Sequence, residues 1–259
     1  MHNALFLWLA QALRGSDTPA LDARLFLQKT QNKATLKRYI ARHLQGEPVA
    51  KILHNKGFYK RDFYVSQDVL DPRPDSETLI EAVLSQHPQR ADILKILDLG
   101  TGSGCLLLSL LDEYPNAHGI GIDISEKALK IAKKNAGQNK RAHFLHQDWR
   151  RLTRPLGTFD IIIANPPYIP TADIAQLDNS VKNYDPLWAL DGGENGLCAY
   201  RDIANILPKL CHAQTDIYFE IGKGQQAQVK KIMARRGFTC VHTYKDLNHI
   251  VRVLQFKQL

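Results

Sequence analysis

The sequence of 259 residues contains no apolar stretch of the roughly 18 to 20 residues that a membrane-spanning helix needs. Its short apolar run at 4–10 lacks both a basic lead-in and a small-residue cleavage site, so no secretory signal is indicated. It also contains no internal repeat and no low-complexity segment. With 44% apolar residues it can bury a complete core. We therefore expect a soluble, cytoplasmic globular protein.

Cysteine is scarce, which excludes a disulfide framework. The four cysteines are far apart, form no CxxC pair and have no nearby histidine cluster with zinc-like spacing: Cys105, Cys198, Cys211 and Cys240. We expect reduced cysteines and no bound metal. The formal charge of +8 would favour an acidic partner, either nucleic acid or an acidic protein. That indication is weak, because Lys and Arg are spread along the chain.

Apolar residues recur at three- and four-residue spacing from residue 3 to about residue 44, which is the helical period. Asp17 and Thr35 are candidate helix starts. After Gly46-Glu47-Pro48 the pattern changes to aromatic residues among charged ones, as in a β-hairpin. We predict a helical domain at 1–55, a β-hairpin linker at 56–74 and a catalytic domain at 75–259.

Apolar strands and helices alternate from Leu94 onward. We predict strands at 95–99, 118–122, 143–145, 159–164 and 217–221, with helices beginning at Gly104 and Ser125. This alternation is typical of a parallel sheet covered on both faces, so the fold class is α/β. Two further strands, at 239–243 and 250–255, are expected to pair as antiparallel edge strands.

A glycine loop follows the first of these strands in Asp98-Leu99-Gly100-Thr101-Gly102-Ser103-Gly104. Bare backbone there can approach a ligand at the carboxyl end of the strand. A tight turn without a ligand is the alternative, because a glycine loop alone is a weak motif. Asp123 closes the second strand, where a carboxylate can accept both hydroxyls of a ribose. Capping the next helix is the alternative role for Asp123, but Ser125 is the better predicted cap. Asp148 follows the third strand and could accept from an adenine amino group, while Trp149 or its neighbours pack the ring.

The spacing GxGxG differs from the dinucleotide fingerprint GxGxxG, and Asp98 precedes its first glycine. We therefore predict S-adenosylmethionine as the cofactor, with S-adenosylhomocysteine as its product. Asp98 could hold the ammonium of the cofactor's amino-acid end directly or through water.

Asn165-Pro166-Pro167-Tyr168 follows the fourth strand and so lies on the same rim of the sheet. The Asn165 side-chain oxygen and the Pro166 carbonyl could each accept one N–H of a planar NH₂ group, while the two prolines stiffen the loop. Tyr168 could stack on that group. A methylated amide nitrogen is very acidic, so no strong general base is required. The loop predicts methylation of a planar NH₂ and leaves glutamine and adenine open.

Taken with the motifs that flank them, these residues resemble the protein-(glutamine-N5) methyltransferases of the HemK/PrmC type, which modify the glutamine of the Gly-Gly-Gln loop in peptide chain release factors. The resemblance covers nearly the whole chain. Besides 98–104, Asp123 and 165–168, it includes 46–48, 69–77, 184–186, 189–193 and 219–222. Generic adenine methyltransferases share the Asn-Pro-Pro-Tyr loop but lack this flanking set.

The resemblance implies a Rossmann-like class I methyltransferase domain with a seven-stranded mixed sheet, a release factor as substrate, and Asn165–Tyr168 as the glutamine site. An N6-adenine DNA or RNA methyltransferase is the alternative. No target-recognition domain or concentrated basic helix is recognisable, so we expect a monomer without stable nucleic-acid binding. The chain departs from the family pattern at Asp71, Asp185 and Val251. The sequence leaves open what Arg73 and Glu220 do.

Overall fold

The computed structural model describes residues 2–16, 18–152 and 156–259. Its strands are β1 Lys56–Phe58, β2 Arg61–Phe63, β3 Lys95–Leu99, β4 His118–Asp123, β5 Ala142–His146, β6 Phe159–Ala164, β7 Cys211–Glu220, β8 Phe238–Lys245 and β9 Val251–Gln258. Its α-helices are α1 His2–Ala12, α2 Pro19–Lys29, α3 Lys33–Leu44, α4 Val49–Leu53, α5 Glu77–Gln86, α6 Cys105–Glu113, α7 Glu126–Ala136, α8 Asn179–Lys182, α9 Cys198–Ile206 and α10 Gln226–Ala234. None of the helices in these ranges is long and apolar enough to cross a membrane.

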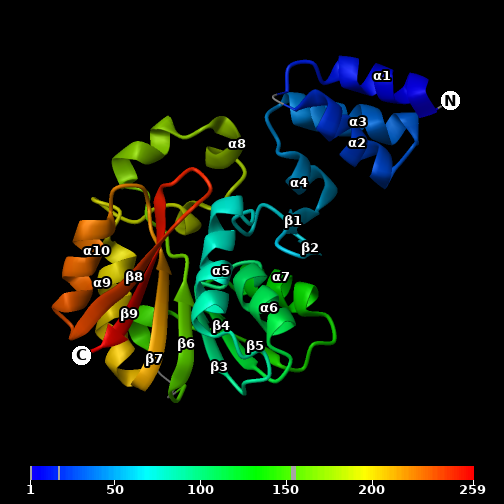
Figure 1. Ribbon diagram of the computed structural model, residues 1–259. Helices are drawn as coiled ribbons and strands as arrows, with labels where there is room; N and C mark the ends of the chain where they lie inside the picture. The colour runs from blue at the N-terminus through cyan, green and yellow to red at the C-terminus, as the bar shows by residue number, and fades with distance from the viewer. Residues whose placement is uncertain (1, 17, 153–155) are drawn as a thin grey trace.

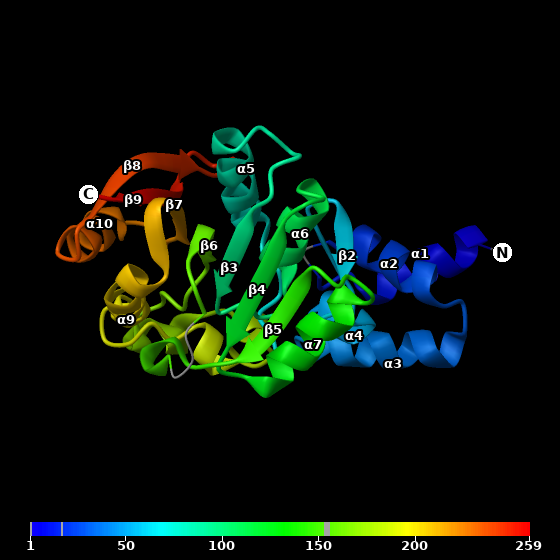
Figure 2. The same cartoon turned by 90° about the horizontal axis from the view of Figure 1, so that it is seen from below.

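Seven strands form one mixed sheet in the order β5-β4-β3-β6-β7-β9-β8 (Figures 1 and 2). The first five are parallel, and β9 is antiparallel to both β7 and β8. The prediction that both C-terminal strands lie at the edge is wrong for β9, which lies between β7 and β8. Its consecutive buried residues 253–256 explain this position, because an interior strand is covered on both faces.

Alternate residues of the central strands pack on opposite faces of the sheet. Ile96 and Ile161 belong to the core cluster that α5 and α6 cover. Leu97 and Ile162 belong to the cluster that α9 and α10 cover. Figure 2 shows these two helical layers on either side of the strands. The result is a three-layer α/β/α arrangement, and the predicted α/β class with a sheet covered on both faces is confirmed.

Helices α1–α4 pack on a core of their own, which includes Leu9, Phe26 and Leu36 (Figure 1). The predicted helix start at Thr35 is wrong, because Asn32 caps α3 by accepting a hydrogen bond from the Thr35 amide, which lies one turn further on. The other predicted start, Asp17, lies outside the described residues. α4 leads into the antiparallel pair β1–β2.

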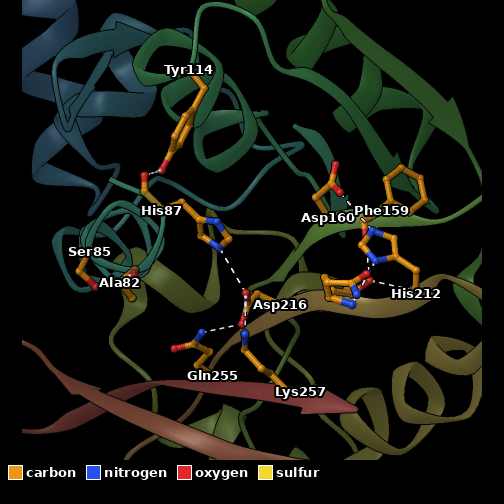
Figure 3. A network of polar contacts seen from close by, with 12 residues as sticks. Ala82, Ser85, His87, Tyr114, Phe159, Asp160, His212, Asp216, Gln255 and Lys257 are labelled. Atoms are coloured by element: carbon orange, nitrogen blue, oxygen red, sulfur yellow. Dashed lines mark hydrogen bonds and ion pairs between the residues drawn. The ribbon is translucent and has the colours of Figure 1, made fainter. Parts of the chain in front are cut away.

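A polar network joins the end of α5 to the C-terminal strands (Figure 3). His87 Nε2 lies 3.4 Å from Asp216 Oδ2 on β7, and Gln255 Nε2 on β9 donates to Asp216 Oδ1 at 2.6 Å. Lys257 lies 3.4 Å from the same carboxylate. These partners lower the pKa of Asp216 although burial opposes them. The network therefore fixes β9 beside β7 without contributing to the rim of the sheet.

Candidate functional site

The carboxyl ends of β3, β4 and β6 meet at one rim, because the register pairs Leu99 with both Ile122 and Ala164. A cavity of about 790 Å³, part of it open to solvent, lies above this rim. We call it the loop cavity. It is lined by 68–73, Ser76, 100–103, Cys105, Leu106, Asp123, Ile124, Ala128, Trp149, Asn165, Pro167, Pro186, Trp188 and Ala189.

The glycine loop forms the floor of the loop cavity. Gly100, Gly102 and Gly104 all have positive φ, a conformation that side chains rarely adopt. A Cβ atom at Gly100 would also lie 3.0 Å from the Trp149 ring. Gly104 does not line the cavity; its amide donates to the Thr101 carbonyl as the chain turns into α6. The loop therefore needs glycine both for its turns and for close packing.

Asp98 lies beneath this floor and is 1% exposed. The Thr101 hydroxyl donates to Asp98 Oδ2 at 2.6 Å, whereas Asp98 Oδ1 has no partner among the described residues. Burial raises the pKa of Asp98 to about 7, and the Thr101 hydrogen bond acts in the opposite direction. The Ser103 hydroxyl is a second buried polar atom without a partner in the described parts of the chain. This pair of unsatisfied groups fits a polar, cationic ligand above the loop.

Asp123 lines the loop cavity at the end of β4. Its Oδ2 accepts a hydrogen bond from the Gly102 amide at 2.9 Å, and its Oδ1 accepts one from the Ser125 amide at 2.8 Å. Burial raises the pKa of Asp123, while these backbone donors lower it. The side chain of Ser125 caps α7 by accepting from the Ala128 amide, as predicted. The Asp123 carboxylate thus orders the glycine loop as well as facing the cavity.

Asp148 and Trp149 occupy different places. Trp149 lines the loop cavity, whereas Asp148 lines a neighbouring cavity that shares Ile124, Trp149, Pro167 and Trp188 with it. The Arg150 guanidinium binds both Asp148 oxygens at 2.8 to 3.1 Å and lowers the pKa of Asp148. The contact of Asp148 with adenine therefore stays a prediction. It would compete with the ion pair between Asp148 and Arg150.

The Asn165 loop continues β6 on the opposite side of the cavity from β4. Asn165 and Pro167 line the cavity, whereas Pro166 is buried. Tyr168 packs against the core, with its ring next to Gly222, and burial raises its pKa to about 12. The structure thus brings Asn165 and Pro167 to the glycine loop. The stacking role of Tyr168 stays a prediction.

Sequence reasoning did not anticipate Ser76, Ile124 and Trp188 as cavity residues. Ile124 directly follows Asp123, and Ser76 lies within the family motif at 69–77, so both positions carried a signal. Trp188 carried none. Pro72 and Arg73, whose role the sequence left open, line the cavity, while Pro74–Ser76 forms the turn before α5.

A buried charge network joins the helical region to this site. Lys51 on α4 is 2% exposed, and its Nζ lies 2.8 Å from Asp71 and 2.9 Å from Asp185. Asp185 also binds Arg73 at 2.6 Å. Burial raises the pKa of Asp71, and Lys51 opposes that shift. Asp71 and Asp185, two of the three residues that depart from the family pattern, therefore both bind the Lys51 ammonium group. These ion pairs tie α4 to the wall of the loop cavity.

The fold and this rim define a class I S-adenosylmethionine-dependent methyltransferase. The sequence matches the methyltransferase domain family over residues 96–183. The ribosomal protein L11 methylase from Lactobacillus delbrueckii subsp. bulgaricus has a similar fold, with a TM-score of 0.50 and 20% identity over 73% of this chain and 82% of that one. In the described residues no group of three or more His, Cys, Asp or Glu side chains could hold a metal ion.

Two curated relatives identify a narrower family than this domain does. The chain is 39% identical to the release factor glutamine methyltransferase of Caulobacter vibrioides, over 93% of this chain and 90% of the relative. It is 44% identical to the release factor glutamine methyltransferase of Rhodospirillum rubrum, over 85% of this chain and 67% of the relative. The chain belongs to the release factor glutamine methyltransferase family, which confirms the resemblance and favours this function over the adenine alternative.

Proposed function

We propose that this protein transfers a methyl group from S-adenosylmethionine to the side-chain amide nitrogen, N5, of the glutamine in the Gly-Gly-Gln motif of peptide chain release factors. The observation that carries the proposal is the position of Asn165, which shares one cavity with the glycine loop. Family membership supports the protein substrate.

The cofactor's adenosine would lie along Asp123, Ile124 and Trp149, and its amino-acid end over the glycine loop. The residues fit this group. Asp98 Oδ1 and Ser103 Oγ are buried and lack partners among the described residues, as expected where a ligand's ammonium and carboxylate complete the hydrogen bonding. Bound there, the cofactor would supply an electrophilic methyl group for transfer.

The substrate glutamine would present its NH₂ group to Asn165 Oδ1 and to the Pro166 carbonyl. Both oxygens accept N–H bonds, which orients the nitrogen and draws its lone pair out of conjugation with the carbonyl. The N–H proton is lost after the methyl group is in place, when the nitrogen is acidic. Catalysis on this scheme rests on positioning rather than on a general base.

The helical region 1–55 would recognise the release factor. Between it and the catalytic domain lies a wide cleft, whose lining includes Leu21 and Leu25 from the helical region and Val181 and Asp185 from the catalytic domain. A cleft with walls from both regions suits a folded protein substrate better than a flipped base. We further propose that the protein acts in the cytoplasm as a monomer without stable nucleic-acid binding.

The test is methyl transfer from labelled S-adenosylmethionine to purified release factors, to DNA and to RNA, followed by mass mapping of the product. We expect one methyl group on the glutamine of the Gly-Gly-Gln motif and none on nucleic acid. A release-factor variant with Gln→Asn at that position is the matched control and should stay unlabelled. An unmodified glutamine, or label on adenine, would refute the proposal.

A further inference from the structure

The two ends of the Asn165 amide have nearly the same shape but opposite hydrogen-bonding capacity. The end that faces the substrate therefore decides what the site can bind. Asn165 Nδ2 donates to the Ser76 hydroxyl at 3.1 Å. No described residue donates to Oδ1, and Asn165 lines the loop cavity. This orientation leaves the acceptor end free to bind the substrate.

Glu220 stands next to Asn165 because β6 and β7 are parallel and in register, with Ala164 opposite Phe219. Its side chain is 1% exposed, and its Oε2 lacks a hydrogen-bond partner among the described residues. Burial raises the pKa of Glu220 to about 7, whereas hydrogen bonding with Ser76 and Asn165 lowers it. Ser76 and Asn165 thus favour the ionised form of this carboxyl, and the strand register places Glu220 beside Asn165.

A simpler structural role for Glu220 would be an ion pair with the nearby Arg252. Arg252 instead binds Asp75 at 2.7 Å and Asp246 at 2.9 Å. It acts on Glu220 only through the longer-range Coulomb attraction that lowers its pKa. The groups whose hydrogen bonding lowers the pKa of Glu220 are Asn165 itself and Ser76, which accepts from the Asn165 amide.

We propose that Ser76 and Glu220 fix the orientation of the Asn165 amide and so make the site select a side-chain NH₂ over a group that can only accept hydrogen bonds. The inference rests on the proposed function. If the amide were reversed, Oδ1 would face the Glu220 carboxylate in a dry environment, and two acceptors would oppose each other. The NH₂ end would then face the substrate and repel the target NH₂. Ser76 and Glu220 are positioning residues that act through Asn165.

The test compares two peptides that carry the Gly-Gly-Gln motif, one with glutamine and one with the γ-methyl ester of glutamate in its place. The ester is neutral and has no N–H donor, so any change in net charge at position 220 affects both peptides alike. Binding of each is measured at pH 8 in the presence of S-adenosylhomocysteine, which prevents turnover. The ratio of the two dissociation constants reports the orientation of Asn165.

In Glu220→Gln the new side chain can pair with either end of the Asn165 amide, so the preference for glutamine should fall about tenfold, the difference between a charged and a neutral hydrogen bond. Ser76→Ala should lower the ratio less, since Glu220 remains, and Ser76→Thr should restore it. Asp216→Asn, a buried acid on the same strand (Figure 3), and Ser109→Ala, a buried serine on α6, should leave the ratio unchanged.

An equal loss of affinity for both peptides in Glu220→Gln and Ser76→Ala would overturn the inference, because it would indicate a structural role alone. If Glu220→Gln does not fold, the two Ser76 variants decide the question. Failure of the proposed function is separate: it would appear in the wild-type protein as absence of methyl transfer to glutamine, whatever the variants do.

Discussion

The proposed contact between the Asp98 carboxyl and the cofactor's ammonium predicts that cofactor affinity depends on pH. Burial raises its pKa to about 7 in the free protein, so it is mostly neutral at pH 6 and half ionised at pH 7. The ammonium of S-adenosylmethionine binds the carboxylate better than the neutral acid. The ionised fraction rises from about one tenth to about one half between these pH values, so affinity should increase about fivefold.

Isothermal titration calorimetry of the free protein at pH 6 and pH 7 measures this effect. Over this range the ligand's own amino group stays mainly protonated, because its pKa is near 8. Asp98→Asn should bind more weakly and lose the pH dependence. 5′-Methylthioadenosine, which lacks the amino-acid end, is the matched ligand and should bind equally at both pH values. A wild-type affinity that is constant with pH, or the same slope in Asp98→Asn, would refute the reasoning.

The same carboxyl should also make the stability of the fold depend on pH, but in the direction opposite to that of cofactor affinity. The unfolded chain ionises near pH 3.8 and the folded chain near 7, so folding becomes less favourable as pH rises between these values and constant above them. The full shift corresponds to at most about 4 kcal/mol. Asp98→Asn should therefore raise the melting temperature of the free protein at pH 8. A lower melting temperature would contradict the claim that the buried Asp98 charge destabilises the fold.

Three further substitutions test the site and its supports. Asn165→Ala should reduce kcat far more than cofactor affinity, because it removes a contact with the target nitrogen; equal losses in kinetics and calorimetry would exclude that role. Asp123→Ala should mainly weaken cofactor binding in the same titrations, through loss of a buried ribose contact. Lys51→Ala should cost about 3 to 5 kcal/mol in urea unfolding, because two buried aspartates lose their shared partner. Lys60→Ala, which breaks an exposed pair, should cost far less than Lys51→Ala in the same unfolding assay.

The sequence determined the features that depend on local pattern. The apolar runs gave β3 and β6 with their observed bounds, and Ser125 was correctly placed as the cap of α7. The convergence of the glycine loop, Asp123 and Asn165 also followed, because the carboxyl ends of parallel strands must meet at one rim. The reaction class could be inferred from these residues, and the family from the motifs around them.

Only the tertiary structure decided contacts between segments far apart in the chain. Periodicity identifies a strand but not its neighbours, so the interior place of β9 between β7 and β8 was missed. The partners of Lys51, Asp71 and Asp185, come from two distant regions of the chain, and no spacing predicts them. The orientation of the Asn165 amide likewise depends on Ser76, 89 residues earlier, and on Glu220 from the adjacent strand. The sequence supplied the chemical groups, and the packing of distant strands decided which way they point.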